Sequence, residues 1–169
     1  MRMTGFLMIC CVAAMMSPVA ANAGIKVSFI EPERYTDAGL HSEYGAKSRS
    51  ATLTGIQQHL ERLGERYLKP GQDLTIEVID IDLAGRFELW RINARDLRIM
   101  REVTWPRIEV RYTLEQNGVV VESGEEAVTD LNYLMRAGIA YSSDPLRYEK
   151  AMLEEWFRTR FVERQPVLG

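Results

Sequence analysis

Hydrophobic and polar positions repeat along this chain with two different periods. Residues 26–30, 74–83 and 107–115 follow the two-residue alternation of a β-strand, and the β-rich run 119–121 comes next. From Ser50 the apolar residues instead recur three or four positions apart, opposed by polar ones. This spacing predicts an amphipathic helix, which ends at Lys69-Pro70-Gly71.

Two further helices are predicted near the C-terminus. Asp130 is a candidate N-cap for a short helix through residues 133–135. Ser143-Asp144-Pro145 combines an N-cap candidate with proline at the first helical position, which favours a second start. That last helix carries a wide apolar face: Leu146, Met152, Leu153, Trp156, Phe157 and Phe161. We expect this face to be core, and any part left uncovered to be an interaction patch.

Two positions in the strands break the regular pattern. The adjacent apolar pair Val78-Ile79 interrupts the alternation, so the strand is either covered on both faces there or contains a bulge. Asn117-Gly118 lies between two β-rich runs and favours a type I′ hairpin turn, in which both central residues have positive φ.

The register of that hairpin places an acid on its apolar face. A two-residue turn sets Leu114 opposite Val121 and brings Glu125 beside Val110, whereas a bulge near Ser123-Gly124 brings Glu126 there instead. Because an unpaired buried charge is costly, one of these acids is expected to lie at the sheet edge or to have a partner.

The order of elements is therefore β-α-β, a variable segment, then β-β-α-α. It predicts an α+β two-layer sandwich, mainly antiparallel, with helices packed on one face of the sheet. Residues 85–101 fit a short helix, an extra strand or a long loop. Residues 24–169 contain no internal repeat and are predicted to form a single domain.

The N-terminus has the features of a secretory signal peptide. Arg2 precedes the apolar run 6–16, and Ala21-Asn22-Ala23 places small residues at a peptidase site, so residues 1–23 are expected to be removed after Ala23. This predicts a periplasmic protein. Cys10 and Cys11 would leave with the signal, which excludes cysteine nucleophiles and thiolate metal sites from the mature chain.

Composition narrows the function classes further. The formal net charge is −3 and charged residues make up 27% of the chain, which argues against a strongly basic nucleic-acid binder and against a disordered tail. No apolar run after residue 23 approaches the length of a transmembrane helix. No serine-hydrolase elbow, HExxH motif or glycine-rich phosphate loop is present, and no cofactor is predicted.

Six short motifs follow one another along the chain: Val27-x-Phe29-x-x-Pro32-Glu33-x-Tyr35-x-Asp37, Pro70-Gly71-Gln72-x-Leu74, Asp80-Ile81-Asp82-Leu83-Ala84-Gly85, Trp105-Pro106-Arg107, Asp130-Leu131-x-Tyr133 and Tyr148-Glu149-Lys150-x-Met152-Leu153-x-x-Trp156-Phe157. In this order they resemble the DUF3016 family, a group of exported bacterial proteins of uncharacterised function. The resemblance implies an exported bacterial domain. It implies no catalytic residues.

Asp80 and Asp82 are the candidate metal ligands. Two positions apart on a strand, their carboxylates point to one side, about 6.6 Å apart along the chain. Such a pair suits Mg²⁺ or Ca²⁺, or an acid and a base, with Asp37 or Asp130 as further ligands. The alternative is a solvated strand end, or ion pairs with Arg86 and Arg95.

A candidate ligand or partner surface lies in the segment between residues 86 and 111. Arginines gather there and two tryptophans are interleaved with them, which suits an anionic polymer, a sugar or a peptide. The alternative is an ordinary surface of mixed charge. The candidate residues are Arg86, Trp90, Arg95, Trp105 and Arg107.

These observations favour an exported domain with a non-catalytic binding or structural role in the cell envelope. The expected partner is another envelope protein or an anionic envelope polymer, and not a nucleic acid. The alternative is a metal-assisted hydrolase that uses Asp80 and Asp82.

Overall fold

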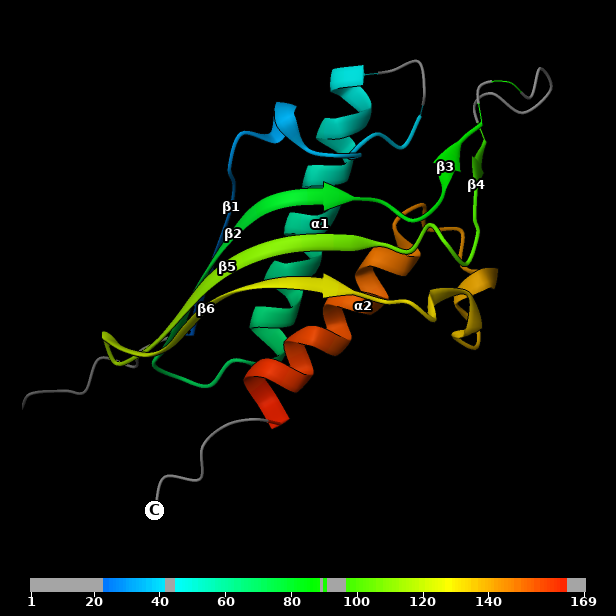
Figure 1. Cartoon of the computed structure of the whole chain (residues 1–169). Coiled ribbons are helices and arrows are strands. Elements are labelled where there is room, and N and C mark those ends of the chain that lie inside the picture. Colours follow the sequence, from blue (N-terminus) through cyan, green and yellow to red (C-terminus); the bar gives the residue numbers. More distant parts are fainter. Residues whose placement is uncertain (1–22, 42–44, 89, 91–96, 164–169) are drawn as a thin grey trace, which may run out of the picture.

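The computed structural model describes residues 23–41, 45–88, 90 and 97–163. A mixed four-stranded sheet forms one layer, and two helices, α1 (Gly45–Tyr67) and α2 (Arg147–Phe157), cover one of its faces (Figure 1). The strands lie in the order β1 (Gly24–Phe29), β2 (Gln72–Asp82), β5 (Arg107–Gln116), β6 (Val119–Thr129). Among these four strands, β1 and β2 form the one parallel pair, and α1 connects them. The predicted α+β class is confirmed.

The core lies between the sheet and the two helices. Every second residue of β5, from Ile108 to Leu114, and of β2 as far as Val78 is buried against the helices, as the alternation predicts. The apolar faces of α1 and α2 close the layer from the other side. The residues at its centre are Ile56, Leu60, Leu74, Ile76, Val78, Ile81, Ile108, Val110, Leu153 and Phe157.

The break in the β2 alternation is a bulge. The register against β5 shifts between Val78 and Asp80, so that both Val78 and Ile81 point into the core although they are three positions apart. The bulge decides which way the end of β2 faces. It leaves the carboxylates of Asp80 and Asp82 on the opposite side from the core.

The β5–β6 hairpin has the predicted turn and a different register. Asn117 and Gly118 both have positive φ, at 52° and 78°, as the type I′ turn requires. The two-residue register was wrong, because the pairing shifts directly after Leu114, which lies opposite Glu122 rather than Val121. The bulge is thus nearer the turn than Ser123-Gly124. It still sets Glu126, rather than Glu125, opposite Val110.

Both main helices begin elsewhere than predicted. α1 starts at Gly45, five residues before Ser50, in a turn without an apolar stripe where the buried Ser48 Oγ accepts the backbone N–H of His41 at 2.8 Å. α2 starts at Arg147, after a turn at Pro145. Leu146, rather than a residue of Ser143-Asp144-Pro145, is the N-cap and makes no side-chain capping hydrogen bond; Asp144 instead holds the turn before α2, where its Oδ1 accepts the N–H of Leu146 at 2.9 Å.

In the variable segment, β3 (Arg86–Phe87) pairs with β4 (Arg98–Ile99). This pair projects from the main sheet just beyond the end of β2, and we call it the β3–β4 arm (Figure 1). Short 3₁₀ turns follow β6 at Tyr133–Met135 and Ile139–Tyr141, and a π-helical segment, Arg158–Glu163, follows α2. No described helix is long and apolar enough to cross a membrane. The predicted signal peptide, with Cys10 and Cys11, lies outside the described residues except for Ala23.

Candidate functional site

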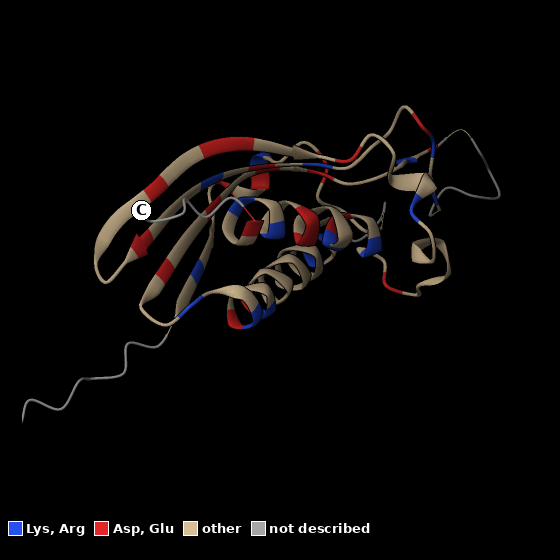
Figure 2. Ribbon diagram, turned by 90° about the horizontal axis from the view of Figure 1, so that it is seen from below, with Lys and Arg blue, Asp and Glu red and all other residues tan. Residues whose placement is uncertain are grey.

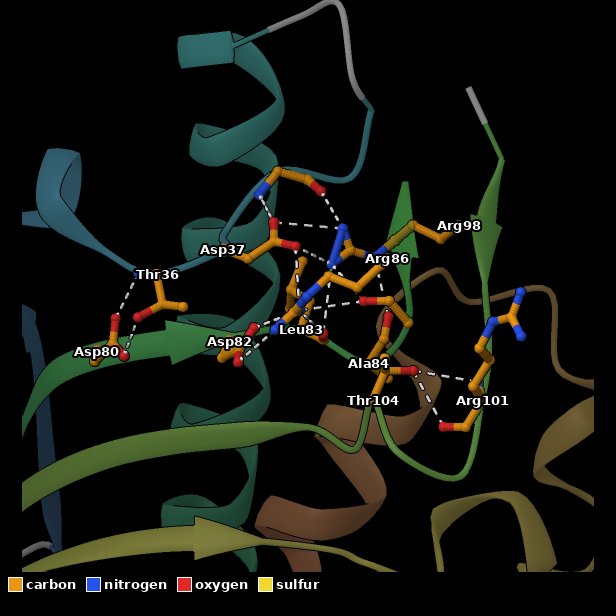
Figure 3. Close-up of polar contacts among 12 residues, drawn as sticks. Thr36, Asp37, Asp80, Asp82, Leu83, Ala84, Arg86, Arg98, Arg101 and Thr104 are labelled. Carbon is orange, nitrogen blue, oxygen red and sulfur yellow. Dashed lines mark hydrogen bonds and ion pairs between the residues drawn. The ribbon is translucent and has the colours of Figure 1, made fainter. Parts of the chain in front are cut away.

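The two candidate metal ligands at the end of β2 have different partners (Figure 3). Asp80 accepts two hydrogen bonds from Thr36, one from the backbone N–H at 2.7 Å and one from Oγ1 at 2.8 Å. Asp82 forms a two-pronged ion pair with Arg86, at 2.6 and 2.9 Å. The sequence left open ion pairs with Arg86 as the alternative to a metal site, and Asp82 makes such a pair.

Asp37 joins this group through its backbone and its side chain. Its N–H donates to the Ile81 carbonyl at 2.8 Å, and its carboxylate pairs with the largely buried Arg98 of β4 at 2.6 Å. Burial raises the pKa of Asp37 and lowers the pKa of Arg98, and their mutual attraction opposes both shifts. The pair fastens the β3–β4 arm to the loop beside β2.

Glu149 of α2 contacts the turn at the end of β2. Its Oε1 accepts the backbone N–H of Ala84 at 2.8 Å, while Oε2 is buried with no hydrogen-bond partner among the described residues. Burial raises the pKa of the carboxyl, and the Ala84 N–H opposes that shift. Glu149 therefore ties α2 to the turn that follows β2.

The carboxylates of this region are thus engaged by protein groups. Asp130, the other ligand considered, accepts the N–H of Asn132 at 3.0 Å and pairs with Arg136. Within the part of the chain that the structure describes, no group of three or more His, Cys, Asp or Glu side chains is placed to hold a metal ion. The metal site at Asp80 and Asp82 stays a prediction, and no contact described here favours it.

The candidate arginine–tryptophan surface is divided among different neighbours. Arg86 belongs to the network with Asp82, and Arg107 pairs with Glu109 on β5. Trp90 and Trp105 are 75% and 38% exposed, respectively. Arg95 lies outside the described residues. Exposed tryptophans keep this surface available for contact, but two of its arginines are already neutralised.

A groove of about 510 Å³ lies elsewhere, between β6 and α2. The C-terminal half of β6, from Glu126 to Thr129, forms one wall, and the segment 130–136 closes one end. Met152, Trp156 and Thr159 line the opposite side. Apolar groups and charged groups both line the groove, as in sites that bind a ligand by its shape and orient it by its charge.

Ion pairs fix the polar lining of the groove. Arg160 pairs with Glu122, at 3.2 Å, and with Glu126, while the indole N–H of Trp156 donates to Glu126 at 3.0 Å. At the other end Arg136 bridges Asp130 and Glu155. The lining contains three acids, Glu126, Asp130 and Glu155, against the two arginines, so its formal charge is negative.

The π-helical segment shapes this lining. Directly after α2 the chain winds more widely through Arg158–Glu163, a geometry often found beside functional sites. Here Arg160 lies over the ring of Tyr112 at 5.6 Å from its centre, and Phe161 contacts the same ring edge-on at 5.3 Å. Arg160 thus turns toward the acids of β6, while Phe161 enters the core.

The comparison with protein families agrees with the order of motifs. The model of a family described as "Protein of unknown function (DUF3016)" matches residues 23–159. The chain belongs to the DUF3016 family. A search of curated proteins finds no match, and a search of solved structures finds none either. The matched part of this DUF3016 chain includes β6, α2 and the groove up to Thr159.

Sequence reasoning found part of the groove. It predicted that Glu125 or Glu126 would lie on the apolar face, either at the sheet edge or with a partner; the acid is Glu126, which lies on the edge strand and pairs with Arg160. It also predicted that the apolar face around Trp156 would form a patch wherever it was left uncovered. It missed Arg136, Glu155 and Arg160, because their distance along the chain hides their proximity. The preference of Glu126 for a cationic partner was the available signal, but it did not identify Arg160.

Proposed function

We propose that this chain is a non-catalytic binding protein of the bacterial periplasm, and that its groove between β6 and α2 receives part of another envelope protein. The observation that carries the proposal is the groove itself, which adjoins an edge strand of the sheet. Its apolar floor at Met152 and Trp156 lies beside fixed charges on both walls. An apolar centre with a charged rim is the usual composition of a protein interface.

The charge of the groove favours a protein over an anionic polymer as the partner. Acids outnumber arginines in its lining, so a polyanion would be repelled. The arginines of the β3–β5 region offer a polyanion little more, because Arg86, Arg101 and Arg107 pair with Asp82, Glu88 and Glu109, respectively.

One feature of the sequence supports the periplasmic location. The first 23 residues have the pattern of a signal peptide. The rest of the chain contains no cysteine, which is compatible with either compartment. Cleavage after Ala23 would leave Gly24, the first residue of β1, at the N-terminus.

Site-specific crosslinking in living cells tests this function. A photoreactive phenylalanine replaces Thr159, which is exposed and lines the groove, in a bacterium that naturally makes the protein. The matched control places the same amino acid at Thr54, an exposed threonine on α1. Irradiation is expected to join position 159, but not position 54, to a distinct protein of the periplasmic fraction.

Two outcomes would count against the proposal. Identical products from both positions would mean that the groove confers no selectivity, and no product from position 159 would mean that no protein occupies it. Products found only in the cytosolic fraction would contradict the location.

A further inference from the structure

The outer edge of β6 is open. β6 is the last strand of the sheet and pairs with β5 on one side only, and no other described element pairs with it. In an antiparallel ladder the residues bond alternately to the neighbouring strand, so every second residue of β6 directs its N–H and C=O outward. β6 is eleven residues long, so its open edge is long enough to pair with an added strand over most of that strand's length.

β6 has only part of the protection usual for an edge strand, namely three glutamates and one bulge. Natural proteins block such edges with lysine, with proline or by shortening the strand, but β6 contains neither a basic residue nor proline. Its bulge lies near the turn, which leaves the stretch from Glu122 to Thr129 in regular register with β5. In addition, Val119, Val120 and Val121 are exposed to 65%, 56% and 56%.

A strand added to this edge would meet a different surface on each face of the sheet. On the helix side its side chains would enter the groove over Met152 and Trp156. On the open face lies a smaller hollow of about 230 Å³, lined by Glu109, Glu125 and Ala127, among others. An apolar residue suits the groove floor. A lysine or arginine suits the hollow, because three glutamates, Glu109, Glu125 and Glu126, line it and no basic residue does, although each of them also pairs with an arginine outside this lining.

The charge of β6 selects against a second copy of the same chain. β6 contains three acids, Glu122, Glu125 and Glu126, and the edge that faces the viewer in Figure 2 has no basic residue along this strand. In the fully overlapping antiparallel pairing, Glu122 of each copy would lie opposite Glu126 of the other. Like charges directly opposite one another destabilise a strand pair.

We propose that β6 binds its partner by strand addition, and that the partner segment is an extended peptide in which apolar residues alternate with lysine or arginine. This inference rests on the proposed function of the groove and defines its ligand. Backbone hydrogen bonds to the β6 edge supply affinity, and the alternation of side chains supplies specificity. Apolar side chains enter the groove, and basic ones occupy the hollow beside Glu109 and Glu125.

Three synthetic peptides test the mode of binding. One alternates valine and lysine, the second alternates valine and glutamate, and the third is the valine–lysine peptide with every backbone nitrogen methylated. The valine–lysine peptide is expected to bind the purified protein at least tenfold more tightly than either of the others and to slow hydrogen exchange of the β6 amides. The methylated peptide keeps every charge but cannot donate backbone hydrogen bonds.

Matched variants test the location. Ala127→Lys places a lysine of the chain itself in the hollow and is expected to weaken binding at least tenfold. Ser28→Lys adds the same charge to β1, on the opposite edge of the sheet and beside Glu77, and is expected to change binding less than twofold. Thr159→Trp, which fills the groove from the π-helical segment after α2, is expected to weaken binding as well. Melting temperatures close to that of the unmodified protein confirm that the variants fold.

Equal binding of the methylated and unmethylated peptides would overturn strand addition, because charge alone would then explain the affinity. Slowed exchange of β6 in the protein alone, rising with its concentration, would overturn it in favour of self-pairing. A failure of the peptides combined with crosslinking at Thr159 overturns strand addition and leaves the binding role of the groove standing. The absence of crosslinking refutes that role directly.

Discussion

Asp80 shows how one distant residue changes the interpretation of a carboxylate. A pair of acids two positions apart resembles a metal site in the sequence, but Thr36 supplies both donors to Asp80 and comes from a loop 44 residues away. Arg86 satisfies Asp82 in the same way. The contacts at each aspartate therefore account for its place at the end of β2 without an ion.

The Thr36–Asp80 contact predicts coupled substitutions. Thr36→Ala is expected to lower the free energy of unfolding by about 0.5–1 kcal/mol, the net value of a hydrogen bond, and to have almost no effect once Asp80 is alanine. Urea unfolding of the two single variants and the double variant measures the coupling. Millimolar Mg²⁺ or Ca²⁺ is expected to leave the melting temperature unchanged. A rise that Asp80→Ala abolishes would instead support the metal site.

Glu149 predicts a dependence of stability on pH. Burial raises the folded pKa of its carboxyl above the ordinary value of 4.5, so the folded chain holds the proton over a range in which the unfolded chain has lost it. The free energy of unfolding therefore falls as pH rises from about 4.5 through the folded pKa, by up to about 1.4 kcal/mol for each pKa unit of difference.

Glu149→Gln removes that proton equilibrium. Urea unfolding between pH 4.5 and 8 is expected to show a shallower fall for the variant than for the unmodified protein. The raised pKa of Asp37 contributes the same slope to both proteins. Glu65→Gln, at an exposed site on α1, serves as the control and is expected to keep the full slope. An equal slope for Glu149→Gln would contradict the assigned role of burial.

At the scale of elements, glycines set how closely the helices approach their neighbours. A Cβ added to Gly64 of α1 would lie 2.7 Å from Cγ2 of Ile25 on β1, and one added to Gly55 would lie 2.6 Å from Cδ1 of Leu146. Neither distance is tolerated without movement. α1 therefore packs against β1 and against the turn before α2 at positions where only hydrogen fits.

Gly64→Val is expected to destabilise the protein by about 1–3 kcal/mol, the range for overpacking a close contact. Thermal and urea unfolding measure the loss. Glu65→Val, one position further along α1 and exposed, is the matched control and is expected to stay within about 0.5 kcal/mol of the unmodified protein. Equal losses for both variants would attribute the effect to the valine in the helix rather than to Ile25.

The sequence predicts those elements whose periodicity is carried by buried side chains. The alternation in β2 and β5 and the stripe of α1 were visible because one face of each is apolar. The start of α1 was not visible in the sequence, because its first turn buries a single serine, Ser48, and carries no stripe of apolar residues. Of the two registers predicted for β6, the two-residue one was wrong, and the bulged one placed Glu126 correctly but put the bulge too far from the turn, since a bulge after Leu114 leaves no mark in a run of three valines.

The candidate site was less predictable than the fold, for a physical reason. Charge pairs such as Arg98–Asp37 and Arg160–Glu126 join residues far apart in the chain, and any arginine suits any carboxylate equally well in the sequence. Trp156 was recognised as part of an apolar face. That it lines a groove depends on the position of β6, which only the structure provides.

At the scale of the whole molecule, the region at the end of β2 and the β6 edge of the sheet differ in how many of their groups are held by internal contacts. The first is fastened by the network of Asp37, Arg98 and Glu149, which ties the β3–β4 arm, β2 and α2 together. The β6 side has an open edge and a groove. This asymmetry separates the part of the molecule that is held by internal contacts from the part that we propose binds a partner.

Export predicts a defined N-terminus. Protein purified from the periplasmic fraction of the native bacterium is expected to begin at Gly24, because the peptidase reads the small residues of Ala21-Asn22-Ala23. N-terminal sequencing or intact mass measures this. An uncleaved chain in the cytosol that retains Cys10 and Cys11 would contradict the periplasmic assignment.

Hydrogen exchange in the presence of the natural partner tests the binding role of the groove most directly. The purified protein is incubated with envelope extract and, separately, with cytosolic extract of the same bacterium, and its amide exchange is followed peptide by peptide. Envelope extract, but not cytosolic extract, is expected to slow amide exchange, and the slowed amides are expected to lie in β6 and in residues 152–163. Slowed exchange confined to the β3–β4 arm, or the same pattern with both extracts, would contradict the account.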